Sequence, residues 1–250
     1  MPKQVFYALT KLSMRTRDIH IIMPVKDSIA TCTKAVEHLL KAMDSPSQLT
    51  IYNDFSTEEN TAKLQQLATE KGCNIIHWAE HTDHPSPNYL LTLQDAQRKA
   101  LADGAHLLIV ESDVLVEENT IERIKMAVNE QAGMVAAVTT DESGVVNFPY
   151  LYAKKWKEGC VATTKRLSFC CTLLSKSLLA AYDFEQLDNT KNWYDVFISH
   201  KSIELGFSNY LLMDTRVVHL PHSSRPWKQL KYSNPLLYYW RKITQRLDKI

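Results

Sequence analysis

Short apolar runs alternate with helix-like segments through the first half of the chain, and this alternation limits its possible folds more than any other feature. The apolar runs are IHIIMPV at 19–25, LTIYN at 49–53, NIIHW at 74–78 and HLLIVE at 106–111. Strands that are apolar almost throughout are buried on both faces, which is typical of parallel sheets covered by helices. The sequence therefore predicts an α/β fold, with a Rossmann-like, mostly parallel sheet and helices on both faces.

Three segments between these runs have the spacing of amphipathic helices. In the first segment the apolar side chains that share one helical face are Cys32, Ala35, Val36, Leu39, Leu40 and Met43. The second segment, 56–72, begins with Ser56 and Glu59 at the spacing of a capping box and ends at Gly72. The third segment is 91–104. Each is long enough to cross from one parallel strand to the next.

The second half of the chain mixes strands and helices. Strands are predicted at 133–140, 166–175, 209–213 and 216–220, and helices at 176–184 and 192–207. No Gly-, Pro- or Ser-rich linker separates the two halves, so 19–220 is predicted to form one domain, in which a smaller lobe is fused to the first half.

Composition excludes several functional classes. The 29 basic and 28 acidic residues nearly cancel, so the overall charge does not favour nucleic acid as a partner. The five cysteines are odd in number and scattered, which indicates reduced thiols, and the vicinal pair Cys170–Cys171 is interpreted as core filling. The sequence has no apolar leader segment and no apolar run near the roughly 20 residues that span a bilayer. We expect a cytoplasmic protein, with at most a peripheral contact at the inner face of the membrane.

The tail at 221–250 carries seven basic residues and one acidic residue. Its apolar side chains recur at three- and four-residue steps, at Leu236, Trp240, Ile243, Leu247 and Ile250. This spacing predicts a basic amphipathic helix. Two interpretations remain open, because such a helix could pack on the body of the protein or bind an anionic membrane surface.

Polar residues follow three of the predicted parallel strands. Lys26 and Asp27 follow the first strand, Asn53 and Asp54 come at the end of the second, and Glu111, Ser112 and Asp113 come at the end of the fourth. Ligands of open α/β sheets bind beyond the C-terminal ends of the strands, although each cluster alone also fits a solvated loop. The sequence contains no Gly-rich phosphate-binding loop. Carboxylates holding Mg²⁺ or Mn²⁺ are the natural alternative for binding a nucleotide diphosphate.

Four segments resemble, in order and spacing, the family-two glycosyltransferases of the GT-A fold. HIIMPVKDSIATCTKAVEHLLKA resembles their first strand and helix, and IYNDFSTEENTAKL resembles their V-V-D-D-G-S-T-D-x-T segment. LLIVESDVLVEENTIERI is similar to L-L-L-D-S-D-V-x-V-x-P, and NWYDVFISHKSIELGFSNYLLMDTRVVHL to Y-W-E-D-V-D-L-x-x-R-x-x-x-G followed by x-A-x-V-x-H. The resemblance implies a nucleotide-sugar-binding half at 19–115 and an acceptor-binding half at 116–220.

The resemblance also implies roles for residues at the strand ends. Asp113 corresponds to the principal metal-binding aspartate and Glu111 to its partner, so the implied cofactor is a divalent metal, Mn²⁺ or Mg²⁺. His219 corresponds to the histidine that completes the metal or diphosphate site, although a histidine at this place could also be a surface residue of an edge strand. Asp195 corresponds to the catalytic base.

Donor and acceptor contacts follow from the same resemblance. The implied donor-binding residues are Pro24, Val25, Lys26, Asp54, Asp95, Glu111 and Ser112. Asp54 matches the aspartate that contacts the uracil ring, which favours a UDP-sugar, whereas Lys26 could meet either phosphate or solvent. Trp193 and Tyr194 are implied on the acceptor side, where Trp193 could stack on a sugar or anchor the core.

The implied activity is transfer of a sugar from a nucleotide-diphosphate donor to a hydroxyl of a glycan or a lipid-linked acceptor, as in cell-surface polysaccharide biosynthesis. Such a reaction needs a cation for the leaving diphosphate and a base for the acceptor hydroxyl, and attack from the side opposite the leaving group inverts the anomeric centre.

The chain departs from the family pattern at several positions. Glu111 replaces an aspartate, Tyr194 and Phe197 replace acidic residues, and PSPNYLLTLQD replaces a Gly- and Asn-rich loop. Two alternatives therefore remain: a catalytically inactive nucleotide-sugar-binding relative, and a sugar nucleotidyltransferase. The segment PVKDSIATC lacks the glycines with which the second class opens.

Overall fold

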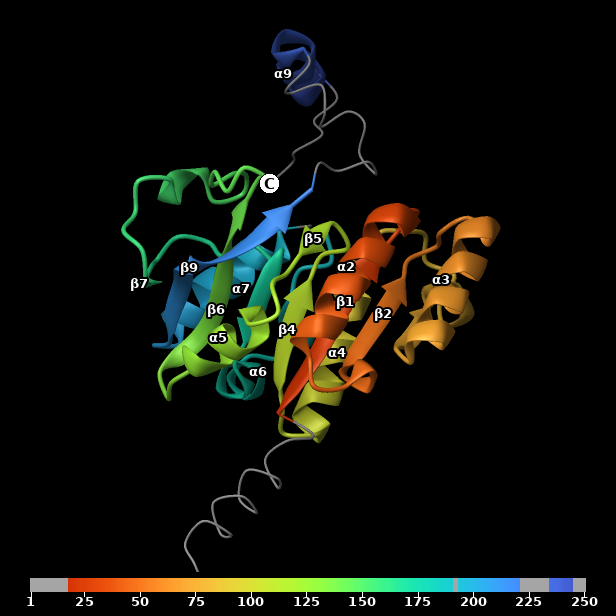
Figure 1. Cartoon of the computed structure of the whole chain (residues 1–250), viewed down its shortest axis with the longest axis horizontal. Coiled ribbons are helices and arrows are strands. Elements are labelled where there is room, and N and C mark those ends of the chain that lie inside the picture. Colours follow the sequence, from red (N-terminus) through yellow and green to blue (C-terminus); the bar gives the residue numbers. More distant parts are fainter. Residues whose placement is uncertain (1–17, 191–192, 221–233, 245–250) are drawn as a thin grey trace, which may run out of the picture.

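A continuous mixed sheet runs through the part of the chain that the computed structural model describes, residues 18–190, 193–220 and 234–244 (Figure 1). The strand order is β3-β2-β1-β4-β8-β6-β9-β5, and β7 pairs with β9. The strands are β1 Ile19–Val25, β2 Leu49–Asn53, β3 Asn74–His77, β4 His106–Val110, β5 Val114–Leu115, β6 Ala132–Thr140, β7 Cys160–Ala162, β8 Cys171–Leu174 and β9 Ser208–His219. The α-helices are α2 Ile29–Ala42, α3 Glu58–Lys71, α4 Tyr89–Ala102, α5 Thr120–Met126, α6 Lys176–Ala181, α7 Tyr194–Glu204 and α9 Pro235–Thr244.

The first four strands form the parallel part of the sheet. Within it, Ile21 of β1 lies opposite Leu49 of β2 on one side and Leu108 of β4 on the other, and β3 extends the same parallel pairing. From β4 onward the sheet is mixed, since β8 is antiparallel to both β4 and β6, whereas β6 and β9 are parallel. The C-terminal ends of β1, β2 and β4 therefore share one edge, the upper edge in Figure 1.

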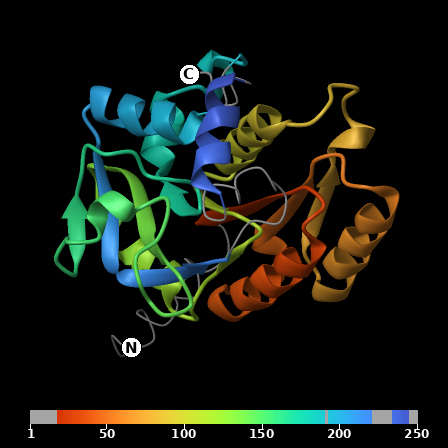
Figure 2. The ribbon, with the colours of Figure 1, turned by 90° about the horizontal axis from the view of Figure 1, so that it is seen from above.

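Two apolar cores cover the two faces of this sheet. Ile21 and Met23 belong to one core and Ile22 to the other, because successive side chains of a strand point to opposite faces. The first core is closed by α2, α3 and α5 and the second by α4, α6 and α7, so helices flank both faces (Figure 2). The predicted α/β fold with helices on both faces is confirmed, and burial on both faces explains the almost continuously apolar strands.

The start of α3 differs from its prediction. The N-cap is Thr57, whose Oγ1 accepts a hydrogen bond from the Asn60 N–H at 3.4 Å. The predicted cap, Ser56, instead accepts a hydrogen bond from the Asp27 N–H at 2.9 Å, which ties the turn after β1 to the turn after β2. The predicted end of the helix is confirmed, because Gly72 takes the left-handed conformation, with a φ of 71°.

The two strands predicted at 209–213 and 216–220 are one strand, β9. Neighbouring residues of β6, Ala137 and Val138, pair with Leu212 and Arg216 of β9. The intervening residues of β9 form a bulge, and the strand resumes its pairing beyond it. This continuity carries β9 to the C-terminal edge of the parallel strands, where it pairs with β5.

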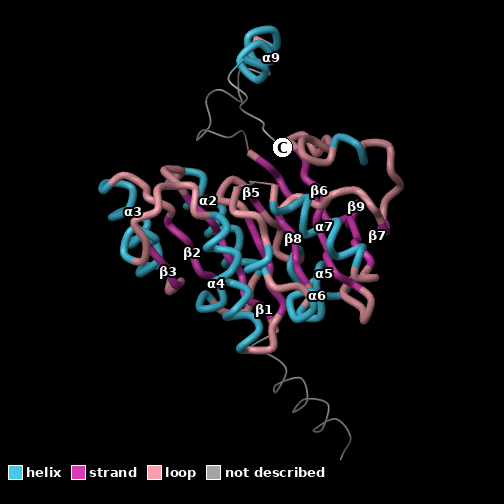
Figure 3. The backbone as a smooth tube through the Cα atoms, turned by 180° about the vertical axis from the view of Figure 1, so that it is seen from behind, coloured by secondary structure: helices cyan, strands magenta, loops and turns pink. Residues whose placement is uncertain are grey.

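Helix α9 lies within the predicted tail, and Figures 1 and 3 place it beyond the C-terminal edge of the sheet. Leu236, Tyr239 and Trp240 are exposed on this helix, whereas Tyr238 is buried. The rest of the tail, 221–233 and 245–250, lies outside the described residues, so its basic amphipathic character stays a prediction. Among the residues that the structure describes, no helix has the length and apolar character needed to cross a bilayer.

Candidate functional site

The pairing of β5 with β9 brings Asp113 and His219 together. Asp113 immediately precedes β5, and Val114 of β5 lies opposite His219, the last residue of β9. A hydrogen bond of 2.9 Å from the Leu220 N–H to the Asp113 carbonyl continues the pairing. His219 Nε2 lies 3.7 Å from Asp113 Oδ2. Two residues that are distant in the sequence thus meet at the C-terminal edge of the sheet.

This carboxylate–imidazole pair is held in a protected position. Asp113 is only 4% exposed, and His219 Nδ1 lies 2.9 Å from the carbonyl oxygen of Phe148. Burial alone would lower the pKa of His219, but the neighbouring carboxylates of Asp113 and Glu111 outweigh burial and raise this pKa to about 9. The site therefore concentrates negative charge next to an imidazole, an arrangement that also suits a divalent cation.

Two further residues lie beside this pair. Glu111 directly follows β4, and Cys170 directly precedes β8. The Glu111 N–H donates to the Cys170 carbonyl at 3.0 Å, and the Cys170 thiol donates to Glu111 Oε2 at 3.2 Å. One ligand atom each from Glu111, Cys170 and His219 lies within 4.8 Å of the other two, so these residues could hold a metal ion. From the sequence, Cys170 was predicted only to fill the core. Its contact with Glu111 depends on the pairing of β4 with β8, and no local motif indicates that pairing.

Asp195, the predicted base, lies in the first turn of α7. Its Oδ2 accepts a hydrogen bond from Arg166 Nη1 at 2.7 Å, and its Oδ1 accepts one from the Val196 N–H at 2.9 Å. Burial raises the pKa of Asp195, and the Arg166 guanidinium offsets this increase only in part. A carboxylate with a raised pKa is better suited to accept a proton than an ordinary one, and Arg166 fixes its orientation. No sequence pattern indicated Arg166.

The ring of Tyr89 packs against residues adjacent to Cys170 and to Asp195. Its ring is stacked with those of Phe169 and Tyr194, with centroids 6.2 and 6.3 Å away. Its hydroxyl is buried and has no hydrogen-bond partner among the residues that the structure describes. Burial raises the pKa of Tyr89, and the negative charges of Glu111 and Asp195 raise it further. No sequence pattern indicated Tyr89, because it lies in the segment that departs from the family pattern.

Asp54, the predicted uracil contact, is engaged with the start of α4. Its Oδ2 accepts hydrogen bonds from Ser86 Oγ at 2.7 Å and from the Asn88 N–H at 3.0 Å. Its Oδ1 accepts a third from Asn88 Nδ2 at 2.9 Å. Because Asn88 directly precedes Tyr89, Asp54 fixes the helix end that carries the buried hydroxyl.

Asp95 lies on α4, where its carboxylate is engaged with Tyr52 of β2 and with basic residues of its own helix. Its Oδ2 accepts hydrogen bonds from the Tyr52 hydroxyl and from Lys99 Nζ, each at 2.7 Å. Arg98 forms a further ion pair with its Oδ1 at 3.5 Å. The structure thus gives Asp95 a part in fastening α4 to β2, and it does not bring Asp95 into the group around Asp113.

The remaining predicted residues differ in accessibility. At the end of β1, Lys26 is exposed, Pro24 is half-buried, and the Val25 side chain is buried in the first core. Ser112 is half-buried between the two acidic residues of its triplet.

On the acceptor side, Trp193 is half-buried immediately before α7. Tyr194 is only 5% exposed and belongs to the second core, where it stacks on Tyr89. The buried position of Tyr194 explains why an aromatic residue can stand where the family pattern has an acid.

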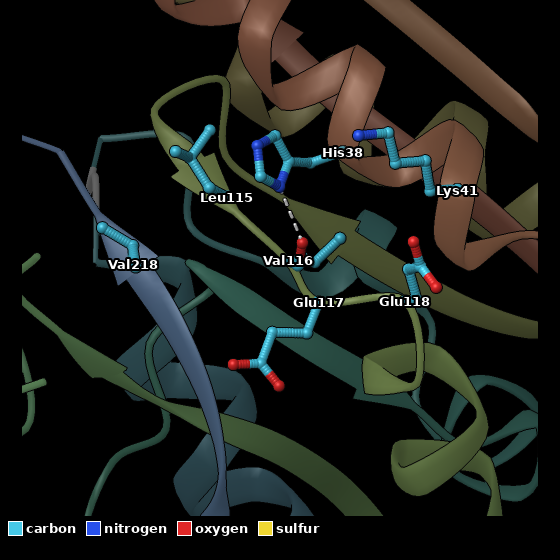
Figure 4. A pocket seen from close by; sticks show the side chains of 7 residues that line it. All are labelled: His38, Lys41, Leu115, Val116, Glu117, Glu118 and Val218. Atoms are coloured by element: carbon cyan, nitrogen blue, oxygen red, sulfur yellow. Dashed lines mark hydrogen bonds between the residues drawn. The ribbon is translucent and has the colours of Figure 1, made fainter.

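A separate shallow hollow lies beside α2 and contains none of the predicted site residues (Figure 4). It is lined by His38, Lys41, Leu115, Val116, Glu117, Glu118 and Val218. The ring of His38 points toward the chain after β5, and its Nδ1 lies 3.0 Å from the Val116 carbonyl oxygen. This contact fastens α2 to the segment that follows Asp113.

Comparisons with known proteins identify the fold. No family model and no curated protein matches the sequence. Among solved structures, a mannosyltransferase from Pyrobaculum calidifontis in complex with GDP-Man and Mn²⁺ matches with a TM-score of 0.61 and 13% identity, over 97% of this chain and 71% of that one. S. aureus TarS 1–349 matches with a TM-score of 0.62 and 15% identity, over 91% of this chain and 66% of that one.

A third structure, GalNAc-T7 with UDP, GalNAc and Mn²⁺, matches with a TM-score of 0.62 and 12% identity, over 84% of this chain and 45% of that one. This chain therefore spans about two thirds of TarS 1–349 and less than half of GalNAc-T7. At such identities the matches establish the architecture, which is that of the GT-A glycosyltransferases, as the sequence predicts.

Proposed function

We propose that this protein transfers a sugar from a nucleotide-diphosphate donor, a UDP-sugar, to a hydroxyl of a glycan or lipid-linked acceptor, with inversion at the anomeric carbon. One observation carries the proposal: the Tyr89 ring stacks on Phe169, which adjoins Cys170 of the candidate metal group, and on Tyr194, which adjoins the candidate base Asp195. The GT-A fold and the nucleotide sugars and Mn²⁺ bound by neighbours of this fold support it.

The residues around Asp113 fit a divalent cation. Asp113 and His219 offer an oxygen and a nitrogen ligand 3.7 Å apart, and Glu111 adds a second carboxylate. Mn²⁺ or Mg²⁺ held there would supply Lewis-acid stabilisation of the leaving diphosphate. Asp113 and Glu111 would also favour binding of the donor in its metal-bound form, because the two carboxylates alone would repel a diphosphate.

The other residues act on the acceptor and on the donor base. Asp195 accepts the proton of the acceptor hydroxyl, and Arg166 keeps its Oδ2 in a fixed direction. Tyr89, whose hydroxyl has no hydrogen-bond partner among the described residues, is the candidate contact to the transferred sugar. Asp54 supports the start of α4 and, by resemblance, faces the uracil ring. By resemblance, residues 19–115 serve the donor and 116–220 the acceptor, except that His219 joins the metal group on the donor side.

The ion pair between Arg166 and Asp195 favours one alternative, an inactive relative that binds nucleotide sugars. Arg166 Nη1 already donates a hydrogen bond to Asp195 Oδ2 at 2.7 Å. This oxygen is therefore less available to take a proton from an acceptor hydroxyl. An inactive relative would bind the donor with a metal and release no nucleotide when acceptors are added.

A thermal-shift panel of nucleotide sugars tests the proposal directly. With Mn²⁺ present, a UDP-sugar at about 100 times its Kd should stabilise the protein by about 2.7 kcal/mol and raise its Tm by several degrees. GDP-sugars and free UDP serve as comparisons, and each is repeated with a chelator in place of Mn²⁺. Acceptor-dependent release of UDP then separates a transferase from an inactive relative. A flat response to every nucleotide sugar would contradict the proposal.

The pH dependence of transfer tests the role of Arg166. Because the guanidinium holds the pKa of Asp195 below the level that burial alone would give, Arg166→Gln should raise that pKa further. A base works only when deprotonated, so the acid limb of the kcat/KM profile should move to higher pH in this variant. The exposed neighbour Lys165 provides the control, and Lys165→Gln should leave the limb in place. A limb that stays unchanged in Arg166→Gln would remove Asp195 from the reaction.

A further inference from the structure

The group formed by Glu111, Cys170 and His219, here called the thiol cluster, contains a sulfur ligand. Carboxylate and carbonyl oxygens are sufficient for Mg²⁺ or Mn²⁺, whereas thiolate together with imidazole is the ligand set of Zn²⁺ and similar ions. The ligand atoms of the thiol cluster already lie within 4.8 Å of one another. Ligands of a tetrahedral zinc ion lie roughly 3.5 Å apart, given metal–ligand distances of about 2.0–2.3 Å. Small rotations of the Glu111 and His219 side chains would therefore complete the site.

We infer that the thiol cluster binds a thiophilic divalent cation, Zn²⁺ or Cd²⁺, with Cys170 Sγ as a direct ligand. The inference deepens the proposed function, because Glu111 and His219 also belong to the proposed metal centre, but its test needs no nucleotide sugar. It predicts that the thiol cluster binds Zn²⁺ or Cd²⁺ in preference to Mg²⁺ or Mn²⁺, unlike a site that has only oxygen and nitrogen ligands.

The backbone fixes Cys170 in this position. The Glu111 N–H is bonded to the Cys170 carbonyl at the junction of β4 and β8, so the two side chains leave neighbouring strands together. Cys170 is only 2% exposed, so its sulfur is shielded from oxidants in solvent. Ser168 Oγ lies 3.4 Å from the sulfur and adds a polar contact behind it.

Binding exchanges one hydrogen bond for one coordinate bond. In the metal-free protein the Cys170 S–H donates to Glu111 Oε2 at 3.2 Å. When the cation binds, the S–H bond breaks and the sulfur donates its electron pair to the cation, and the protonated imidazole of His219 gives up one ring proton so that this nitrogen can donate its own pair; both protons leave to the buffer. Glu111 Oε2, released from the thiol, becomes available as the second ligand, and His219 supplies the third.

Cadmium provides the direct test, because sulfur-to-cadmium charge transfer absorbs in the ultraviolet only when a thiolate is bound. The reduced full chain is titrated with Cd²⁺ in a Cys160→Ser background, since Cys160 is the exposed thiol among the described residues. We expect a charge-transfer band that saturates at one equivalent and disappears when Zn²⁺ is added. Cys170→Ser should abolish the band and weaken Cd²⁺ binding about tenfold or more.

The adjacent Cys171 is the matched control, because it is buried and free but lies outside the thiol cluster. Cys171→Ser should keep the band. Cadmium-edge X-ray absorption of the unsubstituted protein should show a sulfur neighbour, and this measurement holds even if Cys170→Ser fails to fold. Bound Cd²⁺ without a sulfur neighbour, or an unchanged band in Cys170→Ser, would overturn the inference. Neither result would affect the Mn²⁺-dependent thermal shift with a UDP-sugar, so the two proposals fail separately.

Discussion

Replacing Asp195 with Asn should reduce sugar transfer by about 10²- to 10⁴-fold and leave donor binding intact. The carboxylate is the candidate base with a raised pKa, whereas an amide cannot take the proton of an acceptor hydroxyl. Asn at this position keeps the size of the side chain and can still accept the hydrogen bond that Arg166 donates. The loss should therefore appear in kcat, measured as acceptor-dependent release of nucleotide, while the calorimetric Kd of the UDP-sugar with Mn²⁺ stays the same.

Glu204→Gln is the matched control for this variant. Glu204 is an exposed acid at the other end of α7, where it pairs with Lys201, so neutralising it should leave transfer unchanged. Equal Tm values of the two variants would exclude a general effect on folding. Normal turnover by Asp195→Asn would rule out Asp195 as the base.

The parallel half of the fold could be predicted because its signals are local. Each strand from 19 to 111 is a short, almost purely apolar run, and burial on both faces demands such a run wherever helices cover both sides of a sheet. The end of α3 at Gly72 is also local, since glycine tolerates a positive φ. The predicted start of α3 at Ser56 was wrong, because the Ser56 hydroxyl accepts a hydrogen bond from the distant Asp27 N–H, and no local pattern reveals that contact.

The site was harder to predict because it depends on contacts between distant strands. Asp113 and His219 could be matched by resemblance, but their 3.7 Å contact follows from the pairing of β5 with β9. The strand β9 itself was predicted in two parts, since the polar residues of its bulge interrupt the apolar alternation. Arg166 and Cys170 carry no motif at all, and only the pairing of strands and helices places them beside Asp195 and Glu111.

Asp54 was identified by resemblance as a site residue, but its contacts within the protein could not be predicted from the sequence. The resemblance places this carboxylate opposite a uracil ring, whereas in the structure it accepts three hydrogen bonds from Ser86 and Asn88. These bonds hold the turn that leads into Tyr89. A residue that supports the start of α4 and faces the donor base would couple donor binding to the position of the buried hydroxyl.

Replacing Asp113 with Asn should abolish Mn²⁺-dependent donor binding. Asp113 is 4% exposed and contacts His219, so its charge is shielded from solvent and acts strongly on a nearby cation. An amide keeps the shape but removes that charge, and it also removes a carboxylate that raises the pKa of His219. A bound metal stabilises the leaving diphosphate in the transition state by several kcal/mol. Loss of the metal should therefore reduce the rate of sugar transfer by at least about 10²-fold.

The measurement is an electron paramagnetic resonance titration, in which free Mn²⁺ is counted as the UDP-sugar and the protein are combined. Asp113→Asn should leave the Mn²⁺ free, whereas Glu118→Gln should bind it normally. Glu118 is an exposed acid in the segment after β5, where it lines the hollow beside α2. Glu118→Gln therefore also replaces a carboxylate with an amide, but outside the candidate metal group. If Asp113→Asn still binds Mn²⁺ with unchanged affinity, the cation lies elsewhere, and the charge of Asp113 must serve another purpose than holding it. Loss of binding in Asp113→Asn alone would instead trace the donor site to the junction of β4, β5 and β9, because only there do the acidic triplet and His219 meet.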